Sequence, residues 1–357
     1  MYLNINTYII CIFMKIETEI KYDFNDVLIR PKRSTLNTRS EVDLERTMKF
    51  KYSPHTWKGI PIISANMDTT GTFEIYNVLR KYKIITAIHK FYNPEDFKNA
   101  HNTYGLDEDY FMISIGMGEN DINRLKEIFS VVNCKWICID IANGYISNFV
   151  EFCKKVRTEF PDKIIVAGNV VTREMVEELI LSGNVDIVKI GIGPGSACTT
   201  RVKTGVGMPQ LSAIIECSDA AHGVGGHIIS DGGITCPGDV SKALGAGSDF
   251  VMIGGQFAGH DENPGEIINE DGKQYKLFYG MSSTIAMNAY YGKVASYRSS
   301  EGRIVKILYK GKIEDTILDY LGGIRSTCTY INAKCIKNIP KCCTFVRVNR
   351  QLNTIYA

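Results

Sequence analysis

The sequence predicts an α/β protein of the (β/α)8 class, the TIM barrel. Three observations lead to this prediction: short apolar runs recur eight times, helix-like segments separate them, and polar side chains follow the runs directly. The length of 357 residues is also normal for such a barrel, which can hold a large core in one domain. A doubly wound open sheet is the main alternative, and the count of eight runs favours the barrel.

The eight runs have the near-continuous apolar character of strands that are buried on both faces of a parallel sheet. In chain order they are GIPIISAN (59–66), KIITAIHK (83–90), YFMISIG (110–116), WICIDIA (136–142), IIVAGNV (164–170), DIVKIGIG (186–193), HIISDGG (227–233) and DFVMIGG (249–255).

Segments with helical signals lie between these runs. Residues 172–183 open with a threonine cap, carry glutamate in the first turn and close on glycine. Residues 237–247 start with proline and end with glycine. In a barrel the loops after the strands all open on one face, which carries the active site. We therefore expect one face to collect the polar residues after the runs, namely Asn66, Asp68, His89, Lys90, Asp140, Asn143, Asn169, Cys198 and Asp231.

Two segments fall outside the eightfold pattern. Residues 256–312 look irregular, and such a long excursion from a compact domain predicts a flap over a binding site. Near the start, the apolar patch 8–14 is too short for a membrane span and lacks the features of a signal peptide. We treat residues 1–14 as an N-terminal extension of unassigned role and 15–357 as a single barrel domain that includes the flap.

Composition narrows the class of protein. The formal net charge is +2 and no long basic run occurs, which speaks against a nucleic-acid partner. No segment approaches the length of a membrane span. The 11 cysteines are odd in number and form no CxxC pair, which indicates reduced thiols in the cytoplasm.

Glycines end the seventh and eighth runs, in SDGG (230–233) and IGG (253–255). Loops at these two positions of a barrel often bind phosphate, because backbone N–H groups can approach an anion where no Cβ intervenes. Asp231 could accept hydrogen bonds from two ribose hydroxyls. The alternative is that the glycines only make tight turns.

A single thiol lies in the glycine-rich stretch GIGPGSACTTR (191–201) after the sixth run. A cysteine needs activation to act as a nucleophile, and Arg201 or backbone dipoles could help Cys198. Ser196 could offer a hydroxyl to phosphate. Carbonyl groups of Gly193, Gly195 and Cys198 could bind a monovalent cation. The alternative is a loop cysteine without a function.

Longer motifs carry a resemblance to a known family. The stretch VKIGIGPGSACTTRVKTGVGMPQ (188–210) resembles the catalytic loop of the IMP dehydrogenase/GMP reductase family. GHIISDGGITCPGDVSKALGAGSDFVMIGG, LFYGMSS and DFNDVLIRPKRS extend the match, which runs from about residue 16 to the C-terminus.

Three features favour the reductase branch of that family. About twenty residues separate AIHK from YFMISIG, which leaves no room for the pair of CBS modules that typical dehydrogenases insert there. The flap carries Tyr297–Arg298, whereas dehydrogenases have an Arg-Tyr pair that activates water. DIANGYIS (140–147) also looks like the reductases. The alternative is NAD-dependent oxidation of IMP to XMP.

The reductase resemblance implies NADPH-dependent conversion of GMP to IMP and ammonia. Cys198 would form a covalent thioimidate at purine C2, and Thr200 with Glu301 would protonate the leaving ammonia. The implied GMP contacts are Ser196, Asp231, Gly232, Gly233, Gly254, Gly255, Tyr279, Gly280, Met281, Ser282, Arg298, Ser299, Ser300 and Gly302. The implied NADPH contacts are Lys90, Asp140, Ile141, Ala142, Asn143, Met281, Tyr297 and Arg298, with Ile324, Arg325, Ser326 and Thr327 from a neighbouring subunit of a homotetramer. A bound K⁺ would be held at Gly193, Gly195, Cys198 and Arg201.

Overall fold

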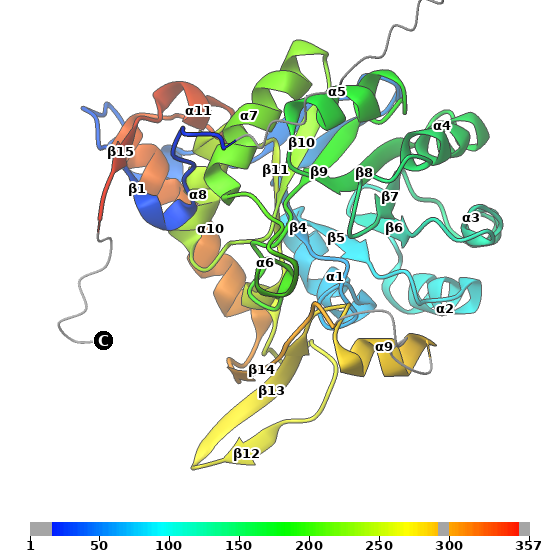
Figure 1. Ribbon diagram of the computed structural model, residues 1–357. Coiled ribbons are helices and arrows are strands. Elements are labelled where there is room, and N and C mark those ends of the chain that lie inside the picture. The colour runs from blue at the N-terminus through cyan, green and yellow to red at the C-terminus, as the bar shows by residue number, and fades with distance from the viewer. Residues whose placement is uncertain (1–15, 292–299, 350–357) are drawn as a thin grey trace, which may run out of the picture.

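A closed barrel of eight parallel strands forms the centre of the computed structural model, which describes residues 16–291 and 300–349 (Figure 1). The strands are β4 (Ile62–Ser64), β5 (Ile85–Ile88), β6 (Phe111–Ile115), β7 (Trp136–Asp140), β8 (Ile164–Val170), β9 (Ile187–Ile190), β10 (His227–Asp231) and β11 (Phe250–Ile253). Each predicted run contains one strand, and β11 pairs with β4 to close the ring. The predicted barrel is confirmed.

Helices pack around the barrel, and those from α1 to α8 lie in the connections between its strands. They are α1 (Phe73–Leu79), α2 (Pro94–Tyr104), α3 (Asp121–Phe129), α4 (Phe149–Glu159), α5 (Arg173–Leu181), α6 (Thr200–Thr204), α7 (Gln210–Gly223), α8 (Pro237–Gly245), α10 (Ile313–Ile331) and α11 (Ile339–Cys342). Both predicted helical segments are present, as α5 and α8. Thr172 holds the N-cap position of α5 without a capping hydrogen bond, and its hydroxyl accepts one from Tyr145 at 3.2 Å. The whole connection from β5 to β6 is α2 and its loops, so no module is inserted there.

A hairpin of β2 (Arg46–Lys49) and β3 (Thr56–Gly59) closes the N-terminal end of the barrel. Trp57 of this hairpin is fully buried, and its ring lies 6.0 Å from Trp136 and 5.2 Å from Phe250, measured between centroids. Trp136 starts β7 and Phe250 starts β11, so the aromatic cluster fills the end of the barrel opposite the predicted site.

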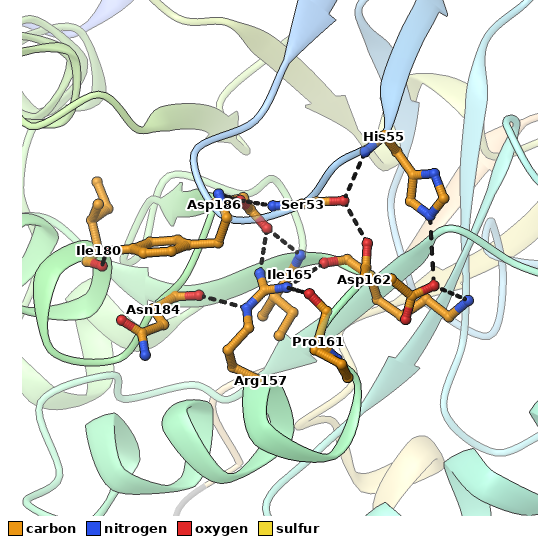
Figure 2. Close-up of polar contacts among 11 residues, drawn as sticks. Ser53, His55, Arg157, Pro161, Asp162, Ile165, Ile180, Asn184 and Asp186 are labelled. Carbon is orange, nitrogen blue, oxygen red and sulfur yellow. Dashed lines mark hydrogen bonds and ion pairs between the residues drawn. The ribbon is translucent and has the colours of Figure 1, made fainter.

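A buried ion pair anchors the connection between β2 and β3 to the barrel (Figure 2). Asp186, directly before β9, accepts backbone hydrogen bonds from Tyr52 at 2.8 Å and Ser53 at 3.3 Å. The same carboxylate binds the Arg157 guanidinium at 2.5 Å and the Ile165 amide at 3.0 Å. The charge of Asp186 is thereby fully paired inside the protein, as burial requires.

The described parts of the excursion after β11, residues 256–291 and 300–312, contain regular elements, so the prediction of an irregular segment is wrong for them. It forms a three-stranded antiparallel sheet of β12 (Ile268–Glu270), β13 (Lys273–Tyr279) and β14 (Ile304–Leu308), with helix α9 (Thr284–Tyr291). Asp271 and Gly272 join β12 to β13 with φ of 50° and 72°, the conformation that Asp-Gly supplies in two-residue hairpins. This flap projects from the lower side of the barrel in Figure 1.

Segments from the two ends of the chain lie side by side, where β1 (Val27–Ile29) pairs with β15 (Phe345–Arg347). Short 3-10 helices complete the described structure at Phe24–Asp26, Arg39–Glu41, Arg80–Tyr82, Gly255–Phe257 and Ile336–Asn338. The predicted extension 1–14 lies outside the described residues. Among the helices that are described, none has the length and apolar character to cross a membrane.

Candidate active site

A chain of two hydrogen bonds joins the three predicted catalytic residues. The Cys198 thiol donates to the Thr200 hydroxyl at 3.2 Å, and that hydroxyl donates to Glu301 Oε2 at 2.6 Å. Cys198 lies in the loop after β9, Thr200 begins α6, and Glu301 comes from the flap. The thiol is half-buried. The structure thus brings together residues that are about a hundred positions apart in the sequence.

Backbone contacts hold the cysteine loop in shape. The Cys198 amide donates to the Gly195 carbonyl at 3.0 Å, and Gly193 has a φ of 87° that favours glycine. Arg201 packs where a Cβ on Gly193 would lie, and its guanidinium binds Asp23 at 3.0 Å and the Met208 carbonyl at 2.5 Å. Arg201 therefore stabilises the loop through Asp23, rather than aiming its charge at the thiol.

The flap is hydrogen-bonded to this loop like an extra strand. Cys198 and Gly302 form an isolated antiparallel bridge. The Thr199 amide donates to the Glu301 carbonyl at 2.7 Å, and the Arg303 amide donates to the Ala197 carbonyl at 2.9 Å. Glu301 is consequently placed by backbone pairing and not by its side chain alone.

A buried lysine links two strand-end carboxylates. Lys189, 1% exposed on β9, binds Asp140 at 2.7 Å and Asp231 at 2.8 Å. Burial alone would lower the pKa of Lys189, but the two carboxylates raise it above its ordinary value. Burial alone would raise the pKa of Asp140, but the charge and hydrogen bond of Lys189 hold it below its ordinary value. The Lys189 ammonium ion and the Asp140 carboxylate therefore stay charged near neutral pH.

Sequence reasoning missed Lys189 as a member of the site. Its signal is a lone lysine inside the apolar run DIVKIGIG. Asn169, predicted only as a polar strand end, donates to Asp231 Oδ2 and to the Gly191 carbonyl, both at 2.8 Å. Lys189 and Asn169 together fix the orientation of the Asp231 carboxylate.

A second group, which includes a residue predicted only as a polar strand end, lies beneath the flap. Asp68, buried after β4, accepts hydrogen bonds from Tyr279 at 2.9 Å and from Tyr290 at 3.2 Å. Burial raises the pKa of Asp68, although the two phenols oppose the shift. Burial and the nearby carboxylate also raise the pKa of Tyr290 to about 12. The Tyr290 ring stacks on Phe91 at 3.5 Å between centroids, next to Lys90 after β5, so α9 rests on the strand ends.

The glycine-rich ends of β10 and β11 meet the cysteine loop. Gly232 and Gly233 have φ of 89° and 81°, and a Cβ on Gly232 would lie 3.1 Å from the Gly195 amide nitrogen. A Cβ on Gly255 would lie 2.6 Å from Ser196 Oγ. The three loops thus come so close together that a side chain on Gly232 or Gly255 would crowd Pro194 or Ser196, and the phosphate site here stays a prediction.

The remaining predicted GMP and NADPH contacts differ in where they lie and how exposed they are. The hydrogen-bonded chain of Cys198, Thr200 and Glu301 is called the relay below. Four predicted contacts lie half-buried beside it, namely Met281, Ser282, Ser300 and Gly302. Two others, Ala142 and Asn143, are exposed after β7. The Ile324 side chain is fully buried on α10 and does not face outward, and its contact with the cofactor of a neighbouring subunit stays a prediction. Arg325, Ser326 and Thr327 are half-buried on α10, and Ser326 accepts a hydrogen bond from Arg39 at 2.7 Å. Tyr297, Arg298 and Ser299 lie outside the described residues.

Fold and site define a (β/α)8-barrel protein with a cysteine–threonine–glutamate site on the face where its strands end. A family profile described as the IMP dehydrogenase / GMP reductase domain matches residues 21–352. The chain therefore belongs to the IMP dehydrogenase/GMP reductase family, as its motifs predicted.

Comparison with curated relatives shows to which branch of this family the chain belongs. GMP reductase 1 of Mus musculus is 57% identical over 343 residues, which cover 96% of this chain and 99% of the relative. GMP reductase of Buchnera aphidicola subsp. Schizaphis graminum is 58% identical over 345 residues, which cover 96% and 99%. GMP reductase 2 of Homo sapiens is 57% identical, with coverage of 96% and 98%. Within the family, the chain therefore groups with the GMP reductases and not with the IMP dehydrogenases.

Proposed function

We propose that the protein reduces GMP to IMP and ammonia with NADPH, through a covalent bond between Cys198 and purine C2. The observation that carries this proposal is the hydrogen-bonded chain from Cys198 through Thr200 to Glu301. The similarity to GMP reductases over 96% of the chain supports the choice of substrate.

The direction of the two hydrogen bonds suits activation of the thiol. In both hydrogen bonds the donor is the group nearer the sulfur: the Cys198 thiol donates to Thr200, and the Thr200 hydroxyl donates to Glu301. The proton on Cys198 can therefore move to Thr200 while the Thr200 proton moves to Glu301. The thiolate that remains is the nucleophilic form of cysteine. It forms a bond to C2, which becomes tetrahedral.

The proton taken up by Glu301 has a second use. Returned through Thr200, it protonates the exocyclic amine, and the C2–N bond breaks with release of ammonia. The product is a thioimidate between Cys198 and the purine. NADPH, when bound, supplies a hydride to C2. The C2–S bond then breaks, and Cys198 leaves as a thiolate with IMP as product.

Chemically distinct surfaces would hold the two substrates. The phosphate of GMP would bind the backbone N–H groups and the hydroxyl that Ser196, Gly232, Gly233, Gly254 and Gly255 offer where the three loops meet. The ribose would bind Asp231, and the base would lie against the flap residues 279–282 and 300–302. For NADPH the chain offers Asp140, a charged carboxylate at the end of β7, with Lys90 as the group that would bind a 2′-phosphate.

The cation, the assembly and the compartment are parts of the same proposal. K⁺ would bind carbonyl oxygens of Gly193, Gly195 and Cys198, where the tight backbone of the loop gathers successive peptide groups. A homotetramer would add α10 residues 325–327 of a neighbouring subunit to the cofactor site. The ten cysteines among the described residues are all free thiols, which supports a cytoplasmic setting.

One assay tests the proposed reaction. Purified protein is mixed with GMP and NADPH, the loss of nicotinamide absorbance is followed, and ammonia is measured. We expect a loss that requires GMP and is abolished in Cys198→Ala. If NADH instead forms from IMP and NAD, the protein is an IMP dehydrogenase and the assignment to the reductases is wrong.

A further inference from the structure

Two histidines and an aspartate meet at the end of the barrel opposite Cys198. His222 lies in the last turn of α7, His227 begins β10, and Asp249 directly precedes β11. His222 Nε2 lies 2.8 Å from Asp249 Oδ2, and His227 Nδ1 lies 3.3 Å from Asp249 Oδ1. One ligand atom from each residue falls within 4.8 Å of the other two.

The second nitrogen of His227 defines the role of the first. Nε2 lies 2.9 Å from the Lys49 carbonyl, which accepts hydrogen bonds only, so Nε2 carries a proton. In the neutral ring, Nδ1 therefore holds a lone pair that points toward a carboxylate oxygen. Two lone pairs repel unless a proton or a metal ion lies between them. A backbone carbonyl that binds the distal N–H is also the usual support of a metal-ligating histidine.

The spacing of the three groups suits a tetrahedral ion. Metal–nitrogen and metal–oxygen bonds of about 2.0–2.1 Å in a tetrahedral site separate the ligand atoms by roughly 3.3 Å. His227 Nδ1 already has this separation from Asp249 Oδ1, and His222 Nε2 lies against the other carboxylate oxygen, Oδ2. His222 needs to move back by about half an ångström by the same geometry. Its side chain is 45% exposed, which gives it that freedom and gives an ion a route from solvent.

We propose that His222, His227 and Asp249 bind one divalent transition-metal ion of the zinc class, with water in the fourth position. Imidazole and carboxylate ligands suit Zn²⁺, Co²⁺ and Ni²⁺. The ion would tie the end of α7 to the starts of β10 and β11. It would be far from the relay, because the relay and these residues lie at opposite ends of the strands.

Arg46 is the group that opposes metal binding. Its guanidinium lies 2.8 Å from Asp249 Oδ1 and places a positive charge beside the site. Oδ2 is bound by His222 and by the Ile228 amide at 3.0 Å, so it can exchange the histidine proton for an ion and keep the amide.

Cobalt titration tests the site directly. Tag-free, chelator-treated protein in a Cys198→Ala background is titrated with Co²⁺ at pH 8, by absorption and by calorimetry. We expect one ion per chain, visible d–d bands of a tetrahedral ion, no thiolate-to-cobalt charge transfer, and displacement by Zn²⁺. His222→Ala should weaken binding by at least about tenfold, because it removes a direct ligand.

Two further variants separate a metal site from a purely structural cluster. His101→Ala removes an exposed histidine on α2 and should change nothing. Arg46→Met should tighten Co²⁺ binding, because the competing charge is gone. Binding that is unaffected by His222→Ala, or that needs more than about 1 mM Co²⁺, overturns the proposal. So does an Arg46→Met protein that folds and binds Co²⁺ no better.

Discussion

Glu301 has two kinds of contact with the cysteine loop, and only one of them is chemical. Its backbone carbonyl pairs with Thr199, while its carboxylate accepts the Thr200 hydroxyl. A substitution of the side chain can therefore remove the proton acceptor and leave the flap docked.

Glu301→Gln should reduce turnover by about 10²–10⁴-fold, the usual contribution of a general acid–base group, with little change in GMP affinity. Steady-state kinetics with GMP and NADPH measure both quantities. Glu270→Gln is the matched control, because Glu270 is an exposed flap carboxylate on β12 whose ion-pair partner among the described residues is Lys306. Full turnover in Glu301→Gln would remove the residue from the mechanism.

At the scale of elements, two aspartates make the same kind of contacts at the start of two neighbouring strand pairs, β8 with β9 and β10 with β11. Asp186 precedes β9 and accepts the Ile165 amide of β8, and Asp249 precedes β11 and accepts the Ile228 amide of β10. Each carboxylate also binds an arginine from a neighbouring element. These two buried carboxylates thus hold neighbouring strands in register and also bind the elements that pack on the N-terminal end of the barrel.

Asp186→Ala should destabilise the protein by about 3–5 kcal/mol, because Arg157 would be left as an uncompensated buried charge. Asp219→Ala breaks a similar pair with Arg173, 2.7 Å long, but at the surface. That control should cost less than about 1 kcal/mol. Urea unfolding of the two variants gives the comparison, and equal losses would show that burial does not set the strength of the Asp186 pair.

The flap depends on a glycine at its point of contact with the loop. A Cβ on Gly302 would lie 2.7 Å from the Ser283 amide nitrogen and 3.0 Å from the Gly280 carbonyl oxygen. Gly302→Ala should push the flap away from Cys198 and lower turnover, with the melting temperature of the barrel nearly unchanged. Gly322→Ala, in α10 with open space around it, is the control for the same substitution. Wild-type turnover in Gly302→Ala would mean that the flap accommodates the methyl group.

At the scale of the whole molecule, two buried histidines make the fold sensitive to mild acid. Burial, with a smaller effect from a nearby cation, lowers the pKa of His89 and of His260 to about 4 in each case. The unfolded chain takes up these protons near pH 6.5, whereas the folded chain resists them until about pH 4. Stability is therefore lost as the pH falls through this window.

His260→Gln should remove one of the two contributions. Relative to the variant, the wild type should lose up to about 1.4 kcal/mol of unfolding free energy per pH unit between pH 6.5 and 4. Urea unfolding at fixed protein concentration across this range measures the difference. Parallel pH profiles would show that His260 is protonated in the native state.

The barrel could be predicted from sequence because its signals are local. Each strand is a short run of apolar residues, and each polar strand end follows its run directly. The flap sheet carried a local signal too, in Asp271–Gly272 and in the alternating burial of β13, but its charged residues masked the pattern. The burial of the Ile324 side chain could not be predicted from its short motif, because it follows from the helical period. With Ile317 and Cys328, Ile324 lies on the buried face of α10.

The links between distant residues could not be predicted from local patterns. A lone lysine in an apolar run does not reveal its partners, and only closure of the barrel places Lys189 between Asp140 and Asp231. The same holds for Asp68, whose two tyrosine partners come from β13 and α9 of the flap.

Lys189 also has a thermodynamic consequence. It shares one positive charge between Asp231, on the proposed nucleotide side, and Asp140, on the proposed cofactor side. A ligand that draws Asp231 away from the ammonium group leaves Asp140 with a larger share of that charge. The affinities at the two sides are then linked, and linkage is reciprocal: the factor by which GMP changes the affinity for NADPH equals the factor by which NADPH changes the affinity for GMP.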